Sequence, residues 1–137
     1  MIVVISLLVI VALLTIVGSQ LGWWSLAMDY LTGTAGGGVD VTVRSFTATG
    51  ESGRAVLRWQ TTAERNCRGF HLYRAESGTT SFVKVNGSLI AGKPPAGGSY
   101  RFNDLTVTAD TAYDYRLLAE GQQGQQVVLT TATAEIP

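Results

Sequence analysis

Two patterns of apolar residues divide the chain, one almost uninterrupted and one with a period of two. Within residues 1–17, Ser6 and Thr15 are the only polar side chains. A segment that is apolar on every side predicts a helix surrounded by hydrocarbon or by other apolar helices. From residue 18 onward small and polar residues mix in, and the helix is predicted to span residues 1–32. A continuous helix ending at Leu31 would be about 47 Å long, more than a bilayer core of about 30 Å requires.

A short glycine-rich stretch follows the predicted helix. Gly33 is a suitable C-cap residue, and the triplet Gly36, Gly37 and Gly38 cannot continue a helix. Residues 33–38 are therefore expected to form a linker.

From Val39 onward, apolar and polar residues alternate in short runs. Val39, Val41 and Val43 show this alternation at the start of the first run, and glycine or proline residues separate the later runs. Seven short strands with turn signals between them indicate a two-sheet sandwich over residues 39–137. The strands are expected near residues 39–46, 55–60, 70–74, 82–85, 100–102, 113–119 and 127–133.

Composition and charge narrow the function. The chain has 137 residues, enough for one modest domain and an appendage. Ten basic residues balance ten acidic residues, which argues against a nucleic-acid partner, since binding to phosphates needs a basic face. The hydrophobic fraction of 46% argues against disorder. The first acidic residue is Asp29 and the first basic residue is Arg44, so the apolar segment carries no charge.

The sequence offers no constellation typical of an active site or a metal site. Cys67 is the single cysteine, which excludes an internal disulfide and favours a small buried apolar side chain. His71 is the single histidine, at an outward-facing strand position, and is expected to be a surface or interface residue. Asp104, Asp110 and Asp114 lie near predicted strand ends, where turn formation explains them better than calcium binding. We expect no enzymatic activity, no catalytic residue, no metal and no cofactor.

Asn86, Gly87 and Ser88 satisfy the sequence requirement for N-linked glycosylation. The same residues are typical of a tight turn after the fourth strand. Turn formation is the simpler interpretation, and glycosylation of Asn86 is an additional expectation if the protein is exported.

Several short motifs in the sandwich region resemble fibronectin type III domains. The run Leu57-Arg58-Trp59 looks like the second strand that supplies the core tryptophan, and residues 69–74 look like the third strand. Leu105, Thr111 and Tyr113 resemble the stretch that ends in a tyrosine corner, with a Leu-to-Tyr spacing two residues longer than usual. The resemblance covers residues 39–136. It implies an all-β immunoglobulin/fibronectin type III-like sandwich, here preceded by one long hydrophobic α-helix.

Three interpretations of the N-terminal segment compete. A cleavable signal peptide would need a basic region before the apolar run and a cleavage site of small residues after it. A simple membrane anchor is compatible with Trp23, Trp24 and Tyr30 at an interface, but it lacks the usual flanking positive charge. A mature pilin-like subunit, whose basic leader has been removed, accounts for the missing charge. Whether Met1 is the initiator or the mature N-terminus stays open.

The layout of an apolar N-terminal helix and a β-rich head resembles archaeal-type pilins and archaellins and, more loosely, bacterial type IV pilins. Bacterial type IV pilins usually carry a glutamate at the fifth mature position, whereas this chain has Ile5.

The resemblance implies a structural subunit of an extracellular, cell-surface filament, with helices bundled in the core and heads forming the outer wall. Its partners would be copies of itself and, before assembly, the membrane. The alternative is a membrane-anchored, monomeric adhesive or carbohydrate-binding surface module. The residues expected to face the filament core or membrane are Ile2, Val3, Ile5, Leu8, Val9, Leu13 and Ile16.

Overall fold

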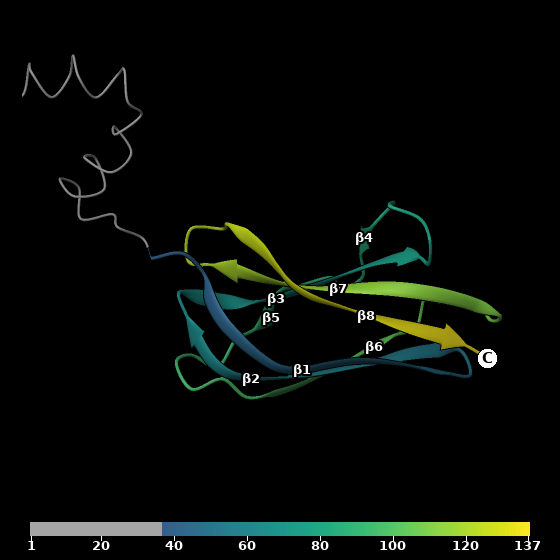
Figure 1. The fold of residues 1–137 in the computed structure, drawn as a ribbon, viewed down its shortest axis with the longest axis horizontal. Coiled ribbons are helices and arrows are strands. Elements are labelled where there is room, and N and C mark those ends of the chain that lie inside the picture. The colour runs from purple at the N-terminus through teal and green to yellow at the C-terminus, as the bar shows by residue number, and fades with distance from the viewer. Residues whose placement is uncertain (1–36) are drawn as a thin grey trace, which may run out of the picture. The chain divides into compact units, whose positions relative to one another are not determined.

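The alternating segments form eight strands in two antiparallel sheets (Figure 1). A computed structural model describes residues 37–137, so the predicted helix over residues 1–32 and the first part of the linker lie outside the described residues. The strands are β1 (Asp40–Glu51), β2 (Arg54–Arg65), β3 (Cys67–Glu76), β4 (Val83–Lys84), β5 (Ile90–Ala91), β6 (Ser99–Asp104), β7 (Thr111–Gly121) and β8 (Gln126–Ile136).

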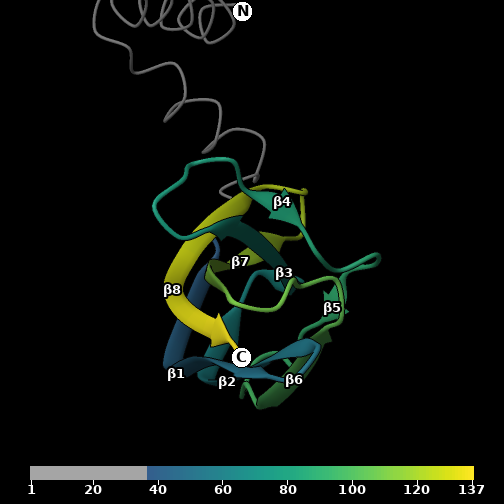
Figure 2. The same ribbon diagram turned by 90° about the vertical axis from the view of Figure 1, so that its right-hand side faces the viewer.

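One sheet has the order β1-β2-β6 and the other the order β4-β3-β7-β8, with β5 also paired to β3. Figure 2 shows the two layers end on, with β1 and β8 on one side of the sandwich and β5 and β6 on the other. The pairing joins distant parts of the chain, as in the register that places Cys67 opposite Gly121. The two-sheet sandwich expected from the alternation is confirmed.

The seven predicted strands are all present, and most extend further than the alternation indicated. The short strand β5 was not predicted, because two residues are too few to show a period. It forms because its partner strand holds it in place, with Phe70 opposite Ile90 in the register.

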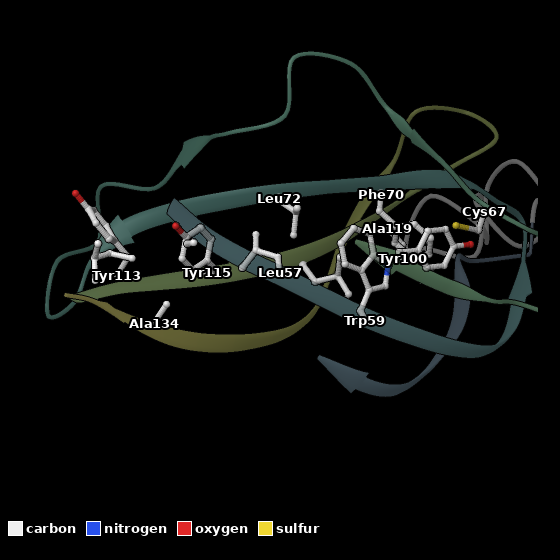
Figure 3. Close-up of a cluster of buried hydrophobic side chains, with 13 residues drawn as sticks. Leu57, Trp59, Cys67, Phe70, Leu72, Tyr100, Tyr113, Tyr115, Ala119 and Ala134 are labelled. Atoms are coloured by element: carbon white, nitrogen blue, oxygen red, sulfur yellow. The ribbon is translucent and has the colours of Figure 1, made fainter. Parts of the chain in front are cut away.

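Aromatic rings fill one end of the core between the sheets (Figure 3). The rings of Trp59 and Tyr100 stack with centroids 5.1 Å apart, and Phe70 meets Trp59 edge-on at 5.8 Å. Leu57 and Leu72 continue the core toward its other end, where the rings of Tyr113 and Tyr115 lie. The Nε1 atom of Trp59 is buried without a hydrogen-bond partner, so Trp59 contributes through packing alone.

The predicted tyrosine corner is present at the start of β7. The Tyr113 hydroxyl oxygen accepts a hydrogen bond from the backbone N–H of Thr108 at 3.1 Å. The apolar residue that packs on the core before this corner is Val107, whereas Leu105 is 70% exposed. The expectation for Leu105 was therefore wrong. Val107 stands two residues later, at the usual distance from the tyrosine.

The first and last strands, although in different sheets, touch near the end of β1. A Cβ atom added to Gly50 would overlap the backbone carbonyl of Glu135 in β8. The absence of a side chain at Gly50 therefore allows the edges of the two sheets to close on each other at this point.

Candidate functional site

The residues singled out from the sequence fall into two groups. The seven residues expected in a filament core or membrane lie outside the described residues, so their assignment stays a prediction. The polar candidates lie within residues 37–137. His71 and Asn86 share one hydrogen-bonded network and Asp104 belongs to another, whereas Glu64, which the sequence did not single out, forms a third. These networks, and one open strand edge, are the features that could carry a function.

Asn86 is the anchor of the first network, on the outer side of β3. Its Oδ1 atom accepts from the Leu72 backbone N–H at 2.8 Å, and its Nδ2 atom donates to the Ser88 carbonyl at 2.9 Å and to Nδ1 of His71 at 3.0 Å. The side chain is 2% exposed. A sugar would be attached to Nδ2, which is buried and already makes two hydrogen bonds. This geometry argues against glycosylation of Asn86 in the folded domain.

His71 lies under the segment that carries Asn86. It alternates with the core residues Phe70 and Leu72, in keeping with the expected outward-facing position. It is nevertheless buried and does not lie on the surface. Its Nδ1 accepts from Asn86, and its Nε2 lies 2.7 Å from a carboxylate oxygen of Glu120, which also pairs with Arg68 at 3.3 Å. The hydrogen bond to His71 lowers the pKa of Glu120. Both ring nitrogens are occupied, so His71 joins strands and has no free nitrogen to act as a base.

Glu64 forms the second network, at the aromatic end of the core. Its buried carboxylate accepts from the hydroxyls of Thr61 at 2.6 Å and Tyr100 at 2.5 Å, and from the Lys93 backbone N–H at 2.6 Å. Burial and the hydrogen bond to Glu64 raise the pKa of Tyr100. Burial and the charge of Glu64 also raise the pKa of the Cys67 thiol, which makes it unreactive. The expectation of a buried, free cysteine is confirmed.

Asp104 forms the third network and connects the two sheets. From β6 it accepts from Arg74 of β3 at 2.6 Å and from the Tyr115 hydroxyl of β7 at 2.9 Å. Burial alone would raise the pKa of Asp104, but hydrogen bonds from Thr106, Arg74 and Tyr115 outweigh it and lower the pKa. The Thr106 backbone N–H also donates to Asp104 at 2.9 Å, so the expected turn role is present together with the cross-sheet role.

Of the other two aspartates, Asp110 occupies a turn as expected, whereas Asp114 lies within β7 and not in a turn. Asp110 has a φ of 56°, a left-handed conformation that aspartate tolerates in turns. Asp114 accepts from the hydroxyls of Thr133 and Ser77 at 2.7 and 2.8 Å, and these bonds lower its pKa. Among residues 37–137, no group of three His, Cys, Asp or Glu side chains could hold a metal ion.

The aromatic side chains of the described domain are not fully exposed at its surface. Every aromatic side chain within residues 37–137 is buried or half-buried. The guanidinium of Arg116, for example, covers the ring of Phe82 at 3.7 Å.

No helix in this part of the chain is long and apolar enough to cross a membrane.

Among the strands of the described domain that are longer than two residues, β8 has the largest number of exposed large apolar side chains. Val127 and Val128 are exposed near its start, and Leu129 lines a groove beside it. Val41, Val43 and Phe46 of β1 line the opposite wall of this groove. The combination of an exposed edge and an adjacent groove with an apolar wall suits a peptide strand better than a small molecule.

Comparison with known proteins identifies the fold. No protein-family model and no curated protein matches the chain. A fibronectin type III-like protein from Clostridium thermocellum has a similar structure, with a TM-score of 0.54 and 17% identity over 72% of this chain and 94% of the other. Pectate lyase Pel3 from Pectobacterium carotovorum matches with a TM-score of 0.52 and 19% identity over 69% of this chain and 26% of the enzyme.

A family 76 glycoside hydrolase from Bacteroides thetaiotaomicron also matches, with a TM-score of 0.53 and 12% identity over 71% of this chain. The match covers 20% of that enzyme, so the sandwich spans only a fraction of either enzyme. At these identities the similarity concerns the fold alone. The described domain is a fibronectin type III-like β-sandwich.

Proposed function

We propose that the chain is a structural subunit of an extracellular filament, in which apolar N-terminal segments bundle in the core and the sandwiches form the outer wall. One observation carries this proposal. The chain has no charged residue before Asp29, and the described residues already supply a core for the sandwich within residues 39–136. An uncharged, apolar segment of this kind needs an apolar environment.

A bundle of identical segments supplies that environment. Burying an aliphatic side chain stabilises by about 1.5–3 kcal/mol. Summed over the segment, this gives a large free energy that favours leaving water. A bilayer and a helical bundle both cover every face of a helix. A subunit can therefore be stored in the membrane and transferred to the growing filament without exposing apolar surface to water. Contacts between unlike surfaces of neighbouring subunits, if they do not close into a ring, extend the assembly without limit.

The competing function is a membrane-anchored, monomeric adhesive or carbohydrate-binding surface module. Carbohydrate sites usually present an aromatic face, and no aromatic side chain is fully exposed within residues 37–137. This observation favours the filament over a carbohydrate-binding module.

Electron microscopy of material sheared from cells that express the full chain tests the proposal. We expect thin filaments that contain this chain, and we expect Val9→Asp to abolish them because a charge in a bundle of apolar helices is not compensated. Val83→Asp places the same charge on an exposed residue of the sandwich and should leave the filaments intact. Recovery of the chain only as dispersed monomers in detergent would refute the filament and favour the anchored module.

A further inference from the structure

The outer edge of β8 lacks most of the features that normally keep an edge strand from pairing. β8 pairs only with β7, and its nine residues from Gln126 to Ala134 include no charged side chain and no proline. Exposed strand edges are usually protected by charges, prolines, bulges or short length. β8 has 11 residues, and its one irregularity is a bulge at Leu129.

The space beside this edge can receive the side chains of an added strand. β1 and β8 touch near Gly50, and the groove opens elsewhere along the same two strands. Val43 and Phe46 on one wall and Leu129 on the other give it apolar contacts. An added strand would hydrogen-bond to the β8 backbone, and its inward-pointing side chains would cover this groove.

We propose that β8 pairs antiparallel with β8 of a second copy of the chain, so that two sandwiches share one continuous sheet. Charge favours this partner, because an uncharged strand brings no like charges together when it meets itself. Length favours it as well. The edge strands β4, β5 and β6 are short, with two, two and six residues, whereas two β8 strands match along most of their length. The other long edge strand, β1, has 12 residues but carries Asp40, Arg44 and Glu51.

This contact joins two heads and involves no residue of the apolar N-terminal segment. The pairing of heads is a separate proposal that does not depend on the proposed filament. Absence of filaments together with intact β8 pairing would refute only the filament, and filaments whose heads do not pair would refute only this contact.

Sedimentation velocity over a concentration series tests the pairing with a matched pair of variants. The sample is residues 37–137, whose core is complete within that range, and the full chain in detergent serves as a second sample. We expect a monomer–dimer equilibrium that Val128→Lys weakens at least about tenfold, since a lysine on an open edge opposes pairing. Val83→Lys is the control, because Val83 is 55% exposed and Val128 is 53% exposed. Equal effects of the two variants, or a monomer at every concentration, would overturn the proposal.

Cysteine cross-linking tests the symmetry of the contact independently. The native Cys67 is buried, so a cysteine introduced at the surface is the reactive thiol. Under mild oxidation, Thr131→Cys near the middle of β8 should give a disulfide-linked dimer, because an antiparallel pair brings residues near its two-fold axis together. Thr62→Cys, exposed on β2, should react far less. Equal cross-linking at the two positions would contradict a specific β8 contact.

Discussion

The carboxylate of Asp104 lies between the two sheets, where Arg74 and Tyr115 reach it from the opposite layer. Its pKa is lowered from an ordinary value of 3.8. A carboxyl with a lowered pKa in the folded state stabilises the fold fully above its unfolded pKa. That contribution is lost as the pH falls through the folded pKa. The domain should therefore lose stability below about pH 4.

Urea unfolding at a series of pH values between about 2 and 6 measures this effect. Asp104→Asn should lower the free energy of unfolding at neutral pH by about 3–5 kcal/mol, because it leaves Arg74 partly buried without its partner. It should also make the acid-induced loss of stability shallower. Asp114→Asn is the comparison, since the pKa of Asp114 is lowered by hydroxyl groups at the surface. That variant should change both the acid slope and the stability at neutral pH less than Asp104→Asn does, because the two quantities are linked. An unchanged acid slope in Asp104→Asn would contradict this role.

Among the elements, the contact of β1 with β8 depends on one glycine. Gly50→Ala would force the Ala side chain into the Glu135 carbonyl, so the two strand edges must separate. We expect a loss of about 1–3 kcal/mol in the free energy of unfolding, as for other overpacked sites. Gly87→Ala is the matched control, because a Cβ atom at Gly87 would meet nothing within 4 Å. Denaturant unfolding that gives the same result for both variants would show that the edges do not touch in solution.

The sequence predicted the strands and their core-facing residues well, but it did not predict which outward-facing residues are buried by loops. A period of two correctly placed Leu57 and Trp59 in the core, because alternation is a local property of a strand. It also indicated that His71 faces away from the core. Its burial could not be predicted in the same way, since it depends on Asn86, 15 residues later in the chain.

The networks around Glu64 and Asp104 were harder to predict for a similar reason. Each joins side chains from strands that are distant in sequence, such as Arg74 and Asp104. The one available signal was Arg74, a charged residue in step with Phe70 and Leu72, because Glu64 and Asp104 lie beyond the ends of the predicted strands. The β8 edge was visible in the sequence as an uncharged threonine-rich strand, but its position at the edge of a sheet follows only from the strand order.

For the whole molecule, the separation into two parts makes a direct prediction. Residues 37–137 form a compact unit with its own core, so this fragment should give a β-rich circular dichroism spectrum. It should unfold in urea in a single cooperative transition, as small domains usually do. Loss of the folded spectrum on removal of residues 1–36 would show that the sandwich depends on the apolar segment.

The position of β8 in the chain has a consequence for the order of events during synthesis. Ala134 and Ile136 belong to the core, and Ile136 pairs with Thr111 at the start of β7. The sandwich therefore cannot complete its core on the ribosome until nearly all of these 137 residues have emerged. Sheet proteins with such distant pairings also fold slowly, over about milliseconds to seconds. The apolar first 17 residues leave the ribosome long before the head can fold. In the proposed filament subunit, capture of these residues by the membrane would therefore precede folding of the sandwich.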